Sequence, residues 1–269
     1  MQTLHKSVLL DDHSGEPIPV PFRSWSDAGI SLTRGDLSMV AGPPGAGKST
    51  VALNIAIGGK VPTLYFSADS SKATQSVRIV AMLTGQSMSA MRGHIEAMGV
   101  EFWRQEWVQE ALMDASHIRW CFDGQPTLAT LDEELDLYAM TEGDYPALVV
   151  LDNISDFNYE SGDEWGSLRS LTQEFKLTCR DYNIAGLTLH HTSEAFQVTP
   201  TVCPPLYALQ GKVSQTPSTV ITIGQSEHGY MPTAAVKNRN GEGDRSGNTA
   251  IYLEYLPDLA LLRDQRMNG

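Results

Sequence analysis

The sequence has little that would place it in a membrane or in an oxidising compartment. No run approaches the roughly 20 apolar residues of a membrane span, and the N-terminal stretch MQTLHKSVLLDD lacks a signal-peptide pattern. The three cysteines, Cys121, Cys179 and Cys203, lie far apart and form no CxxC pair. This spacing indicates neither a zinc site nor a structural disulfide. We therefore expect a cytoplasmic protein that does not contact a membrane.

Positive charge is also scarce, with 19 Lys and Arg against 32 Asp and Glu and a formal net charge of −13. A protein that coats nucleic acid non-specifically usually has a basic face. Any contact with nucleic acid must therefore be confined to a small region, such as the central channel of a ring. The chain is 41% hydrophobic, which is enough for a full core.

Strand-like and helix-like runs alternate from Leu37 onward, after an N-terminal arm (residues 1–30) that three prolines interrupt. We expect strands at 37–42, 62–68, 117–123, 147–153 and 185–192, helices at 48–59, 71–116, 128–138 and 165–182, a long loop with a short helix at 193–217, and a strand meander over 218–227, 230–240 and 249–256. Repeated βα units predict an α/β domain over residues 31–269. Its sheet should be mostly parallel and flanked by helices, with antiparallel strands added at one edge.

The stretch GPPGAGKST matches G-x-x-x-x-G-K-[ST], the P-loop pattern, between a predicted strand and a predicted helix. Backbone N–H groups of such a loop wrap a phosphate, and the following helix N-terminus adds its dipole. The residues expected to bind ATP are Gly42, Pro43, Pro44, Gly45, Ala46, Gly47, Lys48, Ser49 and Thr50. Lys48 should reach the β- and γ-phosphates, and the Ser49 hydroxyl should ligate Mg²⁺. Asp152, at the tip of the apolar run ALVVLD, is placed to hold the same Mg²⁺.

Other segments narrow the class of P-loop protein. There is no guanine-reading N-K-x-D, and the loop at 193–210 has none of the Arg typical of a small-molecule kinase lid. From about Ile30 to Leu256 the chain resembles RecA-like ATPases, and most closely the ATPase domain of DnaB-type replicative helicases. Five segments besides the P-loop carry this resemblance: LYFSADSSKATQSVR, LVVLDN, LTLHHTS, LQGKVSQTPSTVI and KNRNG.

The resemblance implies a RecA-like fold, a ring that we expect to be a hexamer, and a nucleotide bound between subunits. Lys237 and Arg239 match the family's K-x-R pair, which crosses the interface to the neighbour's γ-phosphate; their spacing on a predicted strand points both the same way. Asp69 matches the family's water-polarising Glu, and His191 its γ-phosphate-sensing Gln. Because Asp is one methylene shorter than Glu, by roughly 1.5 Å, slow hydrolysis is expected. His190, beside His191, is expected to be a buried strand residue.

The family acts on single-stranded DNA, with other replication or recombination proteins as partners, and the loops after Asp152 and His191 should face that strand. Lys212 is the only basic residue in those loops, so Ser, Thr, Gln and backbone groups would hold the phosphates. Two alternatives stay open. One is a metal-dependent nuclease that uses Asp152, Asp156, Glu160 and Asp163. The other is a nucleotide-switched assembly ATPase without motor activity.

Overall fold

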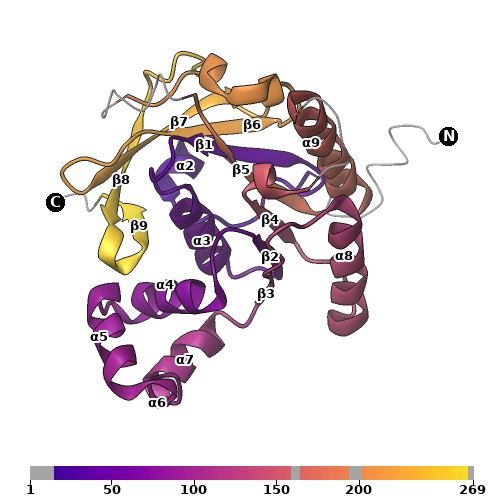
Figure 1. Ribbon diagram of the computed structural model, residues 1–269. Coiled ribbons are helices and arrows are strands. Elements are labelled where there is room, and N and C mark those ends of the chain that lie inside the picture. Colours follow the sequence, from indigo (N-terminus) through magenta and orange to yellow (C-terminus); the bar gives the residue numbers. More distant parts are fainter. Residues whose placement is uncertain (1–14, 159–163, 194–201, 266–269) are drawn as a thin grey trace.

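The central feature of the computed structural model, which describes residues 15–158, 164–193 and 202–265, is one mixed sheet (Figure 1). The nine strands found in these residues have the order β3-β2-β4-β5-β1-β6-β7-β8-β9. Their bounds are β1 Leu37–Gly42, β2 Thr63–Ser67, β3 Ile118–Cys121, β4 Leu148–Asp152, β5 Ala185–His191, β6 Thr219–Ile223, β7 Tyr230–Asn238, β8 Ile251–Leu256 and β9 Leu261–Asp264. The strands from β3 to β6 run parallel, and β7, β8 and β9 extend the sheet antiparallel. The predicted fold class is confirmed.

Helices cover both faces of the sheet (Figure 1). Their bounds are α2 Arg23–Asp27, α3 Lys48–Gly59, α4 Lys72–Thr84, α5 Met88–Met98, α6 Val100–Trp103, α7 Glu106–Asp114, α8 Leu128–Glu142 and α9 Glu164–Asp181. Short 3-10 turns lie at η1 Ile154–Asp156, η3 Leu206–Ala208, η4 Gln210–Gln215 and η5 Pro257–Leu259. The predicted helical stretch 71–116 is therefore four helices, and strand β9 was not predicted.

Two hydrophobic clusters fill the space between the sheet and its helices. On one face α3 packs against the middle strands, and Leu53 is fully buried with Val150 and Leu187. On the other face α8 and α9 cover the sheet through residues such as Leu131 and Phe175. Alternating side chains of each buried strand point into opposite clusters, which is why these strands read as continuous apolar runs.

A third, smaller cluster lies among α4, α5, α6 and α7, which project from the sheet (Figure 1). Its centre is Phe102, whose ring has edge contacts with Trp103 and Trp107. The side chain of Ser89 and its backbone N–H both donate to Asp258 in η5, which ties this lobe to the β8–β9 turn.

Residues before β1 also contribute to the core. Phe22 and Trp25 are fully buried, and the Trp25 indole N–H donates to Thr233 Oγ1 on β7 at 3.0 Å. The part of the predicted arm that the structure describes therefore packs on the sheet; the division at residue 30 stays a prediction.

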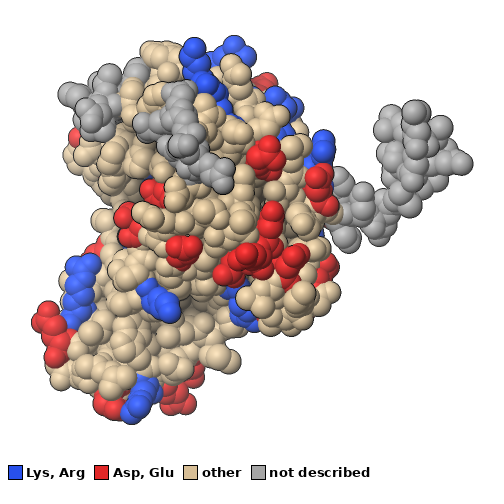
Figure 2. All heavy atoms as spheres, turned by 45° about the vertical axis from the view of Figure 1, so that its right-hand side comes forward, with Lys and Arg blue, Asp and Glu red and all other residues tan. Residues whose placement is uncertain are grey.

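Charge is unevenly spread over the surface. Figure 2 shows Asp and Glu side chains gathered over the middle of one face, with several Lys and Arg side chains along its upper edge. Within the described ranges, no helix has the length and apolar character needed to cross a membrane.

Candidate nucleotide-binding site

The P-loop joins β1 to α3, as predicted. Strand β1 is buried along its whole length and ends at Gly42, and α3 begins at Lys48. Gly45 and Gly47 have φ of +74° and +100°, in the left-handed region that favours glycine. A Cβ at Gly47 would also lie 2.7 Å from Met231 Cε. Backbone sterics and close packing therefore both require glycine at position 47.

Lys48 has its ammonium group inside this loop. Its Nζ donates to the carbonyl oxygens of Gly42 and Pro43 at 3.1 and 3.0 Å, and to His191 Nδ1 at 3.2 Å. Burial lowers the Lys48 pKa to about 8, although the carboxylates of Asp152 and Asp156 oppose the shift. A desolvated ammonium in a cradle of backbone amides is suited to binding a polyphosphate.

Ser49 and Asp152 lie side by side at the C-terminal edge of the parallel strands. The Ser49 hydroxyl donates to Asp152 Oδ1 at 3.0 Å, and the Tyr65 hydroxyl on β2 donates to Asp152 Oδ2 at 2.9 Å. Burial raises the pKa of Asp152, and these two hydrogen bonds counteract the rise. A hydroxyl and a carboxylate oxygen are ligands that Mg²⁺ accepts when phosphates and waters complete its shell. These residues fit the expected ion.

The structure offers less to the nuclease alternative. In the part of the chain that is described, no three His, Cys, Asp or Glu side chains gather in a group that could hold a metal ion. Asp156 instead accepts hydrogen bonds from the backbone and side chain of Asn153. Glu160 and Asp163 lie outside the described residues.

His191 and Asp69 lie at the same edge as the P-loop. His191 ends β5, opposite Gly42 in the parallel register. Burial and the charge of Lys48 lower its pKa, while Asp156 and Asp69 oppose the shift, which places both carboxylates within electrostatic range of the imidazole. Asp69 is exposed, two residues after β2. His190 is buried, as expected, and its Nε2 lies 3.1 Å from the Gln210 carbonyl.

Lys237 and Arg239 lie at the opposite end of the sheet. The Arg239 backbone N–H donates to Ser218 O, and the Ser218 N–H donates to Leu37 O, so Arg239 is level with the first residue of β1. The P-loop starts five residues further along β1, roughly 16 Å away at about 3.3 Å per residue. This pair is therefore remote from the phosphate loop of its own chain.

The two side chains of the pair have different surroundings. Lys237 Nζ donates to the carbonyl oxygens of Ser214 and Gln215 at 2.7 and 2.9 Å. Burial lowers its pKa to about 8, assisted by the positive charges of Arg239 and Lys176. Arg239 is exposed and borders a hollow of about 590 Å³. The end of β7 thus presents one anchored cation and one exposed cation.

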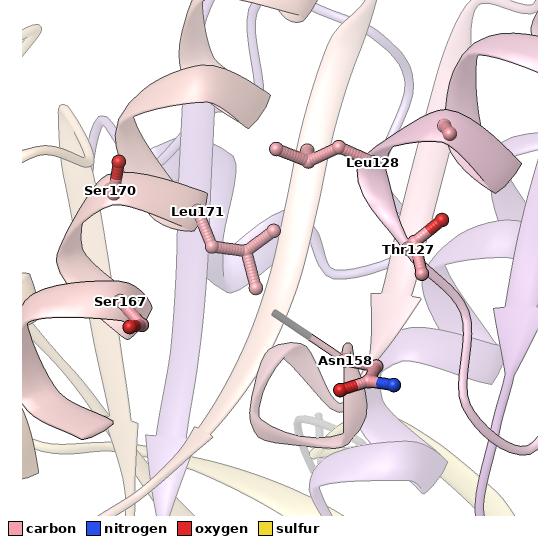
Figure 3. Close-up of a pocket in the computed structure, with 7 residues that line it drawn as sticks. Thr127, Leu128, Asn158, Ser167, Ser170 and Leu171 are labelled. Atoms are coloured by element: carbon pink, nitrogen blue, oxygen red, sulfur yellow. The ribbon is translucent and has the colours of Figure 1, made fainter. Parts of the chain in front are cut away.

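A further cavity of about 580 Å³ lies between the N-terminal parts of α8 and α9 (Figure 3). Leu128 and Leu171 face each other across it, and Asn158, Ser167 and Ser170 supply polar groups. Asn158 belongs to the loop that follows Asp152, one of the two loops predicted to face a strand of DNA. The described residues that line the cavity include no Lys or Arg.

Sequence reasoning missed Tyr65, which restrains Asp152. A signal was available, because a tyrosine in the middle of an apolar strand needs a hydrogen-bond partner for its hydroxyl. It also missed the carbonyl groups that hold Lys237, for which the sequence has no comparable signal.

Comparison with known proteins identifies the class to which this site belongs. Residues 4–195 match a family profile described as AAA domain. The chain therefore belongs to the AAA domain family, and it is a P-loop ATPase domain. Membership implies that the loop at 42–50 binds a nucleotide.

Relatives of the whole chain come from bacteriophages and bacteria. The gene 65 protein of Mycobacterium phage L5 is 31% identical over 271 residues, which cover 98% of this chain and 99% of that protein. A probable plasmid replicative DNA helicase of Chlamydia trachomatis is 23% identical over 84% of this chain, and the match spans 51% of the helicase.

Solved structures confirm the RecA-like fold of DnaB-type ATPase domains. The isolated ATPase domain of a DnaB-like helicase superposes with a TM-score of 0.81 at 12% identity, covering 98% of this chain and 96% of that one. A DnaB-like replicative helicase, solved with reference to its interactions with primase, gives a TM-score of 0.78 at 12% identity, with 98% of this chain and 65% of that chain covered.

Proposed function

We propose that this protein is a Mg²⁺-dependent ATPase that works as a ring and moves on single-stranded DNA, with residues 31–269 as its motor domain. One observation carries the proposal. Lys237 and Arg239 are at the end of the sheet remote from their own P-loop, so a nucleotide that they contact must belong to another subunit. A closed ring is the arrangement in which every subunit can serve its neighbour in this way.

Each residue then has a role that suits its position. Lys48 and the loop amides bind the phosphates, while Ser49 and Asp152 hold Mg²⁺, which neutralises charge on the β- and γ-oxygens. Asp69 aligns the attacking water.

The remaining roles belong to the phosphate product and to the neighbouring subunit. His191, as a neutral imidazole beside Lys48, responds to the γ-phosphate. Lys237 and Arg239 stabilise the charge that develops during phosphoryl transfer in the neighbour, an effect worth about 10³- to 10⁵-fold in rate for an arginine finger.

Two findings favour single-stranded DNA as the track. A relative over most of the chain is a probable replicative helicase, and the fold is that of a DnaB-like helicase domain. The cavity lined by Asn158, Ser167 and Ser170 offers hydroxyl and amide groups, which can bind a phosphate backbone without a basic patch (Figure 3).

An ATPase assay with and without single-stranded DNA, paired with a measurement of molecular mass, tests this proposal. We expect Mg²⁺-dependent turnover that the strand stimulates, an assembled ring, and loss of turnover with retained ATP binding in Arg239→Ala. Full activity of an isolated monomer would overturn the proposal.

A second candidate is a nucleotide-switched assembly protein without motor activity. The scarcity of cations in the loops after Asp152 and His191 favours it, because Lys212 is their only basic residue. The same assay separates the two: this candidate predicts a mass that depends on nucleotide and turnover that ignores DNA.

A further inference from the structure

Lys237 is held by a segment of backbone that also contacts the nucleotide end of β5. We call residues 208–216 the bridging segment. At its far end, the carbonyl oxygens of Ser214 and Gln215 accept from Lys237, and that of Thr216 accepts from Lys176 at 3.2 Å. Three successive carbonyl groups therefore face two ammonium groups, an arrangement that fixes the charge of Lys237 in space.

The near end of the bridging segment is attached to the end of β5 at three points. His190 Nε2 lies 3.1 Å from Gln210 O, Thr192 forms an antiparallel bridge with Leu209, and Ser193 N–H donates to Ala208 O at 2.9 Å. Because a carbonyl oxygen only accepts, Nε2 of His190 carries the proton. His190 is 1% exposed, so this hydrogen bond is shielded from water and its loss would leave the Gln210 carbonyl unpaired.

The middle of the segment is constrained as well. Gly211 and Lys212 have φ of +67° and +55°, and a Cβ at Gly211 would lie 2.5 Å from Trp165 Cε3 on α9. Val213 is buried against the same side of the sheet as α9. Movement at one end of so constrained a segment displaces the other.

We propose that the bridging segment positions Lys237 for the neighbouring subunit's nucleotide, and that His190 is the positioning residue that anchors it. His191, the next residue, contacts Lys48, so the strand end that holds the segment also touches the phosphate site of its own subunit. Through this link, the nucleotide site of one subunit bears on the cation that the subunit offers to the next. The inference rests on the proposed function for the role of Lys237, but the anchoring itself does not.

The test compares His190→Leu, which removes the donor, with His190→Gln, which keeps an N–H at a similar distance from Cα. The full chain is labelled with an amine-reactive reagent, and the modification of each lysine is followed by mass spectrometry. We expect Lys237 to be labelled at least about threefold faster in His190→Leu, because its carbonyl partners are no longer held. His190→Gln should restore the slow rate, and Lys60, which pairs with Asp114 elsewhere, should not change.

Turnover provides the second readout. We expect His190→Leu to lower ATPase turnover about tenfold while the dissociation constant for ATP stays within about twofold, because only the trans cation is displaced. If Lys237→Ala retains wild-type turnover, Lys237 has no trans role and the proposed function fails at that residue. The labelling result still decides whether His190 anchors the segment.

A second variant covers the case in which His190→Leu does not fold, as judged by circular dichroism. Gly211→Ala introduces a strained φ and a contact with Trp165, which displaces the bridging segment without altering β5. It should also accelerate labelling of Lys237. Unchanged labelling of Lys237 in every folded variant of these two positions would overturn the inference.

Discussion

Replacing Lys237 by arginine should remove the alkaline limit of ATPase activity. The pKa of Lys237 is lowered to about 8 by burial first and then by the nearby charges of Arg239 and Lys176. With that pKa about nine tenths of the side chains are charged at about pH 7, but only about one tenth at about pH 9. A neighbour's phosphate favours the ammonium, so the midpoint in the working ring lies at or above about 8. Arginine stays charged throughout this range.

The assay is steady-state turnover at saturating Mg²⁺-ATP, measured as pH rises from neutral for wild type and Lys237→Arg. Saturation matters because Lys48 also has a pKa of about 8, and bound phosphates keep its ammonium charged. We expect the wild-type turnover to fall about tenfold for each unit above the midpoint, while the variant stays level. An equal decline in both proteins would refute a trans-acting charge at position 237.

Loss of the fold would not account for this decline, because stability changes in the opposite direction. The folded-state pKa of Lys237 lies below its ordinary value of 10.5. Between about 8 and 10.5 the unfolded chain therefore binds more protons, and the free energy of unfolding rises with pH. This contribution is lost as pH falls through about 8. Thermal melts over the same range are the control.

Three further substitutions test the cis site and the packing beneath it. Asp69→Glu should raise turnover several-fold, because the carboxylate extends roughly 1.5 Å further towards the water; unchanged or lower turnover would contradict that role. Tyr65→Phe removes a donor to Asp152 and should raise the Mg²⁺ concentration for half-maximal turnover by about three- to tenfold, so an unaltered Mg²⁺ titration counts against the role of Tyr65. Asn54→Ala removes three buried hydrogen bonds, two of which join α3 to the β9 end of the sheet, and should lower the free energy of unfolding by about 2–3 kcal/mol in urea. A loss below about 0.5 kcal/mol would show that these bonds contribute little.

The sequence predicts the nucleotide edge of the fold well, because local signals dominate there. The apolar run ending at Gly42, the glycines of the loop and the helix starting at Lys48 are found where the pattern sets them. Strand β9 was missed since Leu261–Asp264 is only four residues long and lacks a clear alternation. Short edge strands depend on pairing with a neighbour more than on their own composition.

Contacts between distant segments could not be predicted. The alternation of Lys237 and Arg239 indicates a shared direction, but nothing in it shows that backbone carbonyls of residues 214 and 215 bind the ammonium of Lys237. In the same way, Tyr65 meets Asp152 only because β2 and β4 are neighbours in the sheet. The order of parallel strands decides such encounters, and a single sequence does not specify that order.

Mixing two inactive variants tests the central claim most directly. Lys48→Ala lacks the phosphate-binding lysine, and Arg239→Ala lacks the trans cation, so neither should hydrolyse ATP alone. In rings assembled from equal amounts of both, about one interface in four joins an intact P-loop to an intact Arg239. We predict that the mixture recovers about a quarter of the wild-type turnover. A mixture no more active than its separate components would contradict hydrolysis at an interface between subunits.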